Sequence, residues 1–249
     1  MKRNKVLIKS RMSKLNRFSH KRKAKLSGKL IKKLSVPALS VSLALSLFSC
    51  GGDVVEDVVE SLTNNDAEIS YVNAVDQQLT FFAKNATSTK TVYNDEHDVV
   101  TLMTGEVSDE IKHKWLGLTK SEFGIENTNY RNERHSISEH LKNNHHYWLI
   151  AWQEVQEHQV TILEKSSSNS DGQYRVRVFA NQRLDVYVDN NQNKTLTTDV
   201  GKISAWLTIA QCTGLTIGGN EIDLCQAGNM GKSYLAVVNQ DGLISLAQE

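Results

Sequence analysis

Short stretches in which apolar and polar residues alternate recur in the second half of the chain. Residues 174–178 alternate tyrosine and valine with arginine, which places the apolar side chains on one face of a strand. Residues 184–189 alternate in the same way. Near the end, residues 234–238 and 243–246 flank Asp241-Gly242, a dipeptide that favours a hairpin turn. The pattern predicts antiparallel strands and a final hairpin.

The first half of the chain repeats this plan. Two pairs of segments in the first half match two pairs in the second: 69–74 with 78–84 match 176–181 with 183–189, and 147–152 with 159–163 match 233–238 with 243–247. We therefore expect an all-β protein with two tandem antiparallel β-sandwich domains, residues 67–165 and 173–249, joined by a polar linker at 166–172. Each half is long enough for a small sandwich.

The halves differ most at residues 105–144, which we interpret as a long insertion in the first domain. Long loops on rigid scaffolds often carry binding functions. Five histidines lie in or next to this segment, at positions 113, 135, 140, 145 and 146. Neutral imidazoles bind zinc and copper, so a metal site is one hypothesis. The candidate ligands are His135, His140, His145 and His146. Their spacing suits neither one helical face nor one strand face, so solvated histidines remain the alternative.

The first 49 residues have the pattern of a secretory signal peptide. They contain fourteen Lys and Arg and no acidic residue, and the cations stop before the uncharged residues 34–49. This uncharged run of sixteen residues is shorter than the ~20 apolar residues of a membrane-spanning helix. We therefore expect an export signal rather than a transmembrane anchor. Translation could begin at Met1 or at Met12.

The signal ends in Leu47-Phe48-Ser49-Cys50-Gly51, which resembles the lipobox of bacterial lipoproteins. The resemblance implies cleavage after Ser49, a diacylglycerol on the thiol of Cys50, and an acidic lipidated tether over residues 50–66. Two or three acyl chains hold a protein on a membrane durably. Because glycine rather than aspartate follows the cysteine, the family rule implies the outer membrane.

Removal of the signal changes the charge of the protein. Of the 29 Lys and Arg, fifteen remain after the fourteen are removed, against all 28 Asp and Glu, which gives a formal charge of −13. An acidic protein repels polyanions, so we expect it not to bind nucleic acid. Lipidation of Cys50 would leave Cys212 and Cys225, an even pair in an oxidising compartment. We expect a disulfide between them.

Three segments also resemble a family of bacterial envelope domains of unknown function, whose repeats open with V-N-A and continue V-D-V-Y-V-D. The matching residues are Val72-Asn73-Ala74 in the first half, and residues 184–189 and 196–200 in the second. The resemblance implies an immunoglobulin-like fold and a role other than catalysis.

No motif in the chain indicates an enzyme or a cofactor. A serine nucleophile elbow is missing, and no cysteine would remain free as a nucleophile. Asp189-x-Asn191-x-Asn193 resembles part of a calcium loop, but Lys194 and Val200 stand where that loop needs Gly and Glu, so a hairpin turn explains it better. We therefore expect a non-catalytic binding or structural module for an envelope protein or glycan. The alternative is an envelope metal-binding protein.

Overall fold

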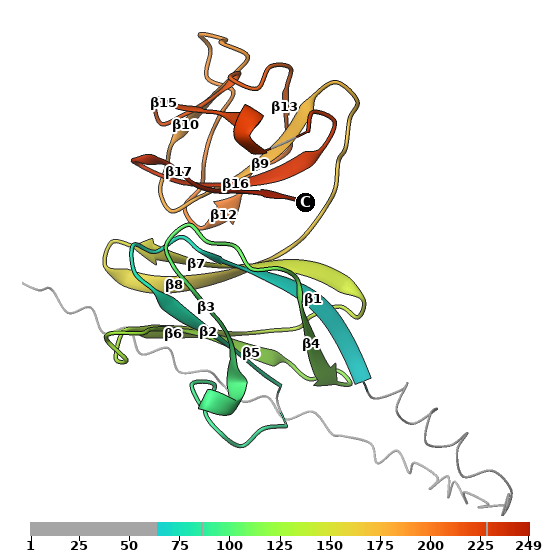
Figure 1. The fold of residues 1–249 in the computed structure, drawn as a ribbon, viewed down its shortest axis with the longest axis vertical. Coiled ribbons are helices and arrows are strands. Elements are labelled where there is room, and N and C mark those ends of the chain that lie inside the picture. Colours follow the sequence, from blue (N-terminus) through green and yellow to red (C-terminus); the bar gives the residue numbers. More distant parts are fainter. Residues whose placement is uncertain (1–63, 86, 228) are drawn as a thin grey trace, which may run out of the picture. The chain divides into compact units, whose positions relative to one another are not determined.

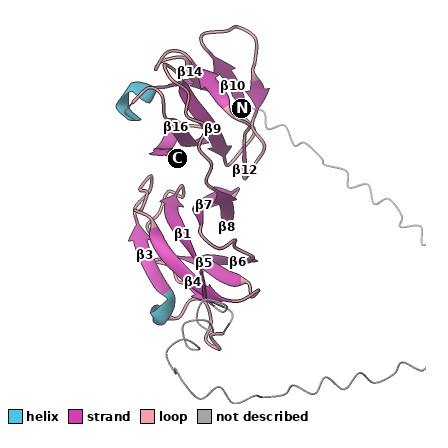
Figure 2. Cartoon of the chain, turned by 90° about the vertical axis from the view of Figure 1, so that its right-hand side faces the viewer, coloured by secondary structure: helices cyan, strands magenta, loops and turns pink. Residues whose placement is uncertain are grey.

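The computed structural model describes residues 64–85, 87–227 and 229–249, which all belong to one compact unit. The predicted signal peptide, the predicted lipid site at Cys50 and the predicted tether up to residue 63 lie outside the described residues. Figure 2 shows that strands make up nearly all of the regular structure. The described residues form an all-β fold with four sheets.

The first two sheets are built from residues 64–164. One has the strand order β4-β1-β7-β8 and the other β3-β2-β5-β6 (Figure 1). Their strands are β1 (Asn64–Asn73), β2 (Leu79–Asn85), β3 (Asp98–Leu102), β4 (Ile111–Leu116), β5 (Ser121–Asn127), β6 (Arg134–Glu139), β7 (His145–Glu154) and β8 (Glu157–Glu164). The short 3-10 helix η1 (Asp95–His97) precedes β3.

The other two sheets are built from residues 174–248. Their strand orders are β12-β9-β16-β17, with β13 also paired to β9, and β11-β10-β14-β15. The strands are β9 (Tyr174–Ala180), β10 (Asp185–Val188), β11 (Leu196–Thr197), β12 (Lys202–Ile203), β13 (Leu207–Ile209), β14 (Leu215–Ile217), β15 (Asn220–Ile222), β16 (Ser233–Asn239) and β17 (Gly242–Gln248). The 3-10 helix η2 (Leu224–Ala227) lies between β15 and β16.

Strand pairing in the second half repeats that in the first. β1 runs parallel to β7 as β9 does to β16, while β2 is antiparallel to β5 as β10 is to β14. The predicted final hairpin is confirmed, because Asn239 pairs with Gly242. The expectation of antiparallel sheets is wrong in one respect. The first strand of each half, β1 or β9, pairs in parallel with the first strand of the last hairpin, β7 or β16. The immunoglobulin-like identity stays a prediction.

Each half has a hydrophobic core between its two sheets. In the second half this follows from the alternation on β9. Val176 and Val178 are buried in the core, whereas Arg177 between them points to the other face. In the first half Leu79 and Phe81 of β2 face Tyr71 of β1, and the two rings meet edge to face with centroids 5.4 Å apart. The halves are therefore two sandwich-like bodies.

A third hydrophobic cluster contains residues of both halves. Every residue from Tyr147 to Trp152 on β7 is buried, and so is every residue from Ser233 to Val238 on β16. Alternate side chains of these runs belong to different clusters: Tyr147, Leu149 and Ala151 to the core of the first half, and Trp148, Ile150 and Trp152 to the third cluster, where they meet Phe179, Leu235 and Val237. Both sheets are thus covered on both faces.

A buried polar group lies at the edge of the third cluster. The indole Nε1 of Trp148 donates a hydrogen bond of 2.9 Å to the carboxylate of Glu249, whose side chain is fully covered. Nε of Arg177 donates to the second carboxylate oxygen at 2.8 Å, and its Nη2 also pairs with Glu249. Lys165 covers the Trp148 ring, with its Nζ 4.0 Å from the ring centroid. These contacts satisfy a carboxylate that would otherwise be costly to bury.

The interpretation of residues 105–144 as a long loop is wrong, because the segment contains β4, β5 and β6. β4 pairs with β1, and β5 pairs with β2, so both sheets of the first half need these strands. On β4 the buried His113 and Trp115 alternate with lysines, a period-two pattern. The second half has shorter strands, β12 to β15, in the corresponding places.

One boundary differs from the prediction, and one predicted turn agrees with it. β1 begins at Asn64 rather than at residue 67, because residues 64–66 pair with the last residues of β4. The resemblance of residues 189–193 to a calcium loop is explained by a hairpin turn between β10 and β11. Asp189 and Asn190 have φ of 52° and 57° there, which Asp and Asn tolerate.

Candidate binding groove between β3 and β4

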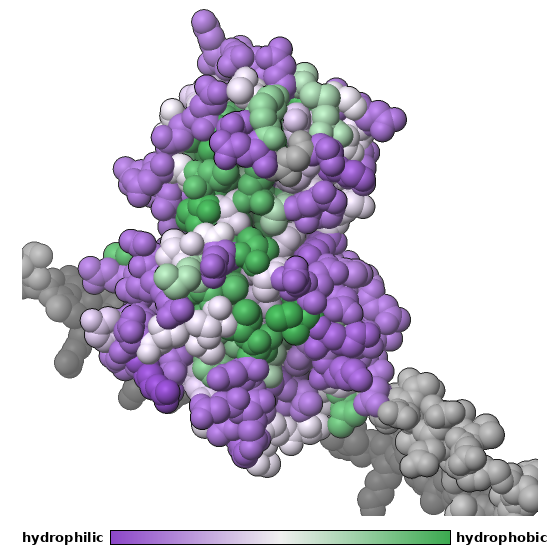
Figure 3. Space-filling view, in the orientation of Figure 1, coloured by the Kyte–Doolittle hydropathy of each residue, from purple (hydrophilic) through white to green (hydrophobic). Residues whose placement is uncertain are grey.

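The first sandwich is open along one side, between an edge strand of each of its sheets. Among the described residues, β3 pairs only with β2, and β4 pairs only with β1. Backbone groups along the outer side of these strands therefore have no partner strand. In Figure 3 apolar side chains gather on this face, between the places that β3 and β4 occupy in Figure 1. An edge of this kind is able to pair with another chain.

A groove runs along this opening in two stretches that share Ile111. The first stretch has a volume of about 490 Å³ and is lined by η1, the start of β3 and the middle of β4. The second has a volume of about 580 Å³ and is lined by Val100 and Leu102 of β3 and by residues 106–109 before β4. The floor carries aliphatic side chains of the first core, among them Val99, Val100 and Ile111.

The two walls of the first stretch carry opposite charges. Glu96 and Asp98 line the wall on the side of β3, whereas Lys112 and Lys114 line the wall formed by β4. Burial, and then the neighbouring Asp95, raise the pKa of Asp98 above the ordinary value for an aspartate. Lys112 is partly neutralised, because its Nζ lies 3.3 Å from a carboxylate oxygen of Asp66.

His113 forms part of the inner surface of the groove. Its side chain is buried, its Nε2 lies 2.7 Å from Oγ of Ser121, and its ring stacks on Trp115 with centroids 6.0 Å apart. Burial lowers the pKa of His113 to about 4, so the imidazole is neutral at pH 7. The floor of the groove is therefore uncharged, and the charges lie on its rims.

The structure does not bring the four predicted histidine ligands together. Nδ1 of His145 lies 2.6 Å from a carboxylate oxygen of Glu164, the last residue of β8. Nδ1 of His146 lies 3.0 Å from a carboxylate oxygen of Glu110, which directly precedes β4. His135 faces neither of them, because it is on β6 in the other sheet. His140 is exposed in the loop after β6. Within the described ranges, no group of three or more potential metal ligands includes any of the four.

His135 instead shares a small pocket with a histidine that sequence reasoning missed. The pocket, of about 220 Å³, lies between residues 133–135 and 156–158 and is lined by both His135 and His158. Nδ1 of His158 is buried without a hydrogen-bond partner. Burial lowers the pKa of His135, which favours the neutral form that binds metals. Period-two alternation on β8 was the signal that places His158 inward.

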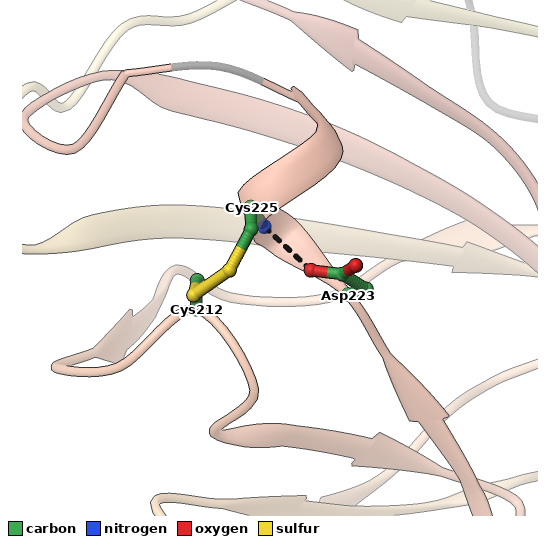
Figure 4. A group of neighbouring side chains, drawn as sticks. All are labelled: Cys212, Asp223 and Cys225. Atoms are coloured by element: carbon green, nitrogen blue, oxygen red, sulfur yellow. Dashed lines mark hydrogen bonds between the residues drawn. A yellow bond between two sulfur atoms is a disulfide. The ribbon is translucent and has the colours of Figure 1, made fainter.

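The predicted disulfide between Cys212 and Cys225 is confirmed (Figure 4). It joins the loop after β13 to η2, where the backbone N–H of Leu224 also donates to the carbonyl of Cys212 at 2.8 Å. The carboxylate of Asp223 lies close to both sulfur atoms and accepts a hydrogen bond from the N–H of Cys225 at 2.8 Å. With the sulfurs bonded to each other, this group supplies no thiolate for a metal.

Among the residues that the structure describes, no helix is long and apolar enough to cross a membrane. No protein-family model matches the chain, and no curated protein matches its sequence. The resemblances to lipoproteins and to the envelope family therefore stay predictions.

Proposed function

We propose that the mature protein is a non-catalytic envelope lipoprotein, held on the outer membrane by lipid on Cys50, whose first sandwich binds an extended segment of another envelope protein. The observation that carries the binding role is the groove between the unpaired edge strands β3 and β4. The support for the anchor is the signal sequence and the lipobox-like residues 47–51.

The walls of the groove favour a polypeptide over a glycan. A sugar-binding surface usually offers an exposed aromatic ring, but Tyr71 and His113 in these walls are only 1% and 9% exposed, and the His97 ring is partly buried and hydrogen-bonded to Ser88. A free strand edge beside aliphatic side chains instead suits an extended chain that adds to the sheet by backbone hydrogen bonds. β3 has five residues, a length of about 17 Å. The acidic and basic rims would fix the direction of the bound segment.

A photo-crosslinking experiment tests the binding role. A photoreactive residue is placed at Asp109, which is exposed on the rim, in the intact lipidated protein in its own envelope. The matched control is Glu139, which is exposed on β6 at the opposite edge of the sheet. We expect one protein to be crosslinked from Asp109 and not from Glu139. Equal crosslinking from both positions, or none from Asp109, contradicts the groove as the site.

A second experiment tests the anchor independently. Cys50→Ala should abolish labelling by radioactive fatty acid and move the protein from the membrane to a soluble fraction. Retention on the membrane without lipid labelling would refute the anchor.

We also propose an alternative function, zinc or copper binding, on the pocket that holds His135 and His158. The buried Nδ1 of His158 without a partner is the observation that favours it. Equilibrium dialysis of the mature protein should then show stoichiometric metal that is lost in His158→Ala. The same test on His145→Ala serves as the control, since that histidine pairs with Glu164. No bound metal in the unchanged protein would end this alternative.

A further inference from the structure

The turn between β4 and β5 exposes the most accessible large apolar side chain of the described chain. Leu118 is 96% exposed, and Leu116 beside it is 38% exposed. Trp115, the next residue back, is 3% exposed, so the change from core to surface is abrupt. Leaving leucine in water has a free-energy cost, and here nothing in the fold of the described residues covers it.

This turn has a fixed shape. Gly117 has φ of +54°, and the N–H and hydroxyl of Thr119 both donate to the carbonyl of Leu116, at 3.2 and 2.7 Å. A third bond ties the turn to β1, because the side-chain amide of Asn65 donates to the carbonyl of Gly117 at 2.7 Å. Leu118 is thus held outward by the backbone.

The turn lies beside the point where the chain comes from Cys50. Asn64, the first residue of β1, pairs with Leu116, the last of β4, and Figure 1 shows the two ends side by side. Cys50 precedes Asn64 by fourteen residues. A chain of that length reaches at most about 50 Å. Whatever holds Cys50 therefore lies within this distance of Asn64, next to the turn.

The charge of the turn is opposite to that of the mature protein. Residues 111–121 contain three lysines and no acidic residue, in a mature chain of formal charge −13. Lys114 and Lys120 are exposed, and neither forms an ion pair with the rest of the described chain. Exposed leucine flanked by unpaired lysine is the combination that suits a lipid surface with anionic headgroups.

We propose that the turn formed by residues 116–120 touches the membrane to which the lipid on Cys50 holds the protein. Leu118 enters the interface between headgroups and acyl chains, and Lys120 lies at the level of the phosphates. The contact orients the first sandwich with this end toward the membrane and leaves the groove exposed along its side. This inference rests on the proposed lipoprotein function.

Vesicle binding of the mature chain, residues 50–249 with Cys50→Ala, tests the contact without the lipid. The vesicles are equimolar phosphatidylethanolamine and phosphatidylglycerol. We expect weak binding at low salt that falls roughly tenfold in Leu118→Ser and about fivefold in Lys120→Gln. The control is Val155→Ser, because Val155 is 94% exposed at the tip of the β7–β8 hairpin and has no lysine neighbour.

Three results would overturn the inference. The first is no binding by the unlipidated chain, and the second is an equal loss in Val155→Ser and Leu118→Ser. The third is binding through this turn to an envelope protein in detergent, without lipid. Fatty-acid labelling of Cys50 in the full-length chain that carries Leu118→Ser separates the two proposals. Normal labelling of that chain, together with vesicle binding that Leu118→Ser leaves unchanged, removes the membrane contact and keeps the anchor. Loss of membrane retention only in Cys50→Ala supports the anchor alone.

Discussion

Phe179 and Trp152 provide the sharpest test of the cluster shared by the two halves. Phe179 is fully buried on β9, and its ring meets Trp152 of β7 edge to face with centroids 6.0 Å apart. Truncation of a buried phenylalanine to alanine costs about 3–5 kcal/mol, since it removes the transfer free energy of the ring and leaves a cavity. We expect this loss of unfolding free energy in Phe179→Ala.

The neighbouring residue supplies the matched control. Val178 is also fully buried, but it points into the core of the second half alone. Val178→Ala should cost on the order of 2 kcal/mol. Urea unfolding followed by circular dichroism and tryptophan fluorescence gives both free energies.

A double-mutant cycle decides whether the contact joins the halves. Combining Phe179→Ala with Trp152→Leu should give a coupling energy between 0.5 and 3 kcal/mol, roughly the range for residues in contact. The cycle of Val178→Ala with Trp152→Leu should give about 0.3 kcal/mol or less. Equal coupling in the two cycles, or none with Phe179, would refute the shared cluster.

Three further predictions concern other parts of the fold. Cys212→Ser opens a loop closed over a sequence separation of 13 and should cost about 3 kcal/mol, seen as a lower thermal midpoint that reductant no longer shifts. Burial lowers the pKa of His113 from 6.5 to about 4, so its contribution to the free energy of unfolding is complete above pH 6.5 and falls by up to about 3 kcal/mol as the pH is lowered toward 4. The free energy of urea unfolding should therefore depend less on pH in His113→Gln. An unchanged pH dependence in that variant would contradict a buried neutral imidazole. Gly201 has φ of +66° and abuts the ring of Trp152, so Gly201→Ala should lower the free energy of unfolding by about 1–3 kcal/mol. Gly172→Ala should cost less, because Gly172 has a similar φ of +70° but an added Cβ there would contact no other atom.

The sequence predicts the strands with strict alternation. For the strands that are buried on both faces, it predicts the strand but not what covers the second face. Alternation predicts β9 and β10 because one face of each meets the core of the second half, whereas the other face carries mostly polar side chains, with Phe179 at the end of β9 as the exception. The continuous apolar runs 147–152 and 233–238 were recognised as strands, but such runs also indicate burial on both faces, which is the signal for the third cluster.

The groove and the role of β4 depend on pairing between distant segments, which a single sequence does not reveal. Ile111 of β4 pairs with Ile69, and nothing in either residue specifies the other. The disulfide was predictable because Cys212 and Cys225 were the only pair left after Cys50 was assigned to lipid. The prediction of a metal site by the four histidines is not supported, because histidine is also common in turns and at strand ends. His145 and His146 lie at such a strand end, where each pairs with a separate carboxylate.

The parallel pairing of β1 has a mechanical consequence. β1 is hydrogen-bonded to β4 over residues 64–69 and to β7 over residues 67–73, so it has a neighbour along its whole length. Tension that enters at Asn64 and acts along the strand shears these bonds together instead of peeling them one after another. A protein tethered at this end and gripped at its side would resist pulling through β1, and extraction of β1 would separate β4 from β7 and open the first core.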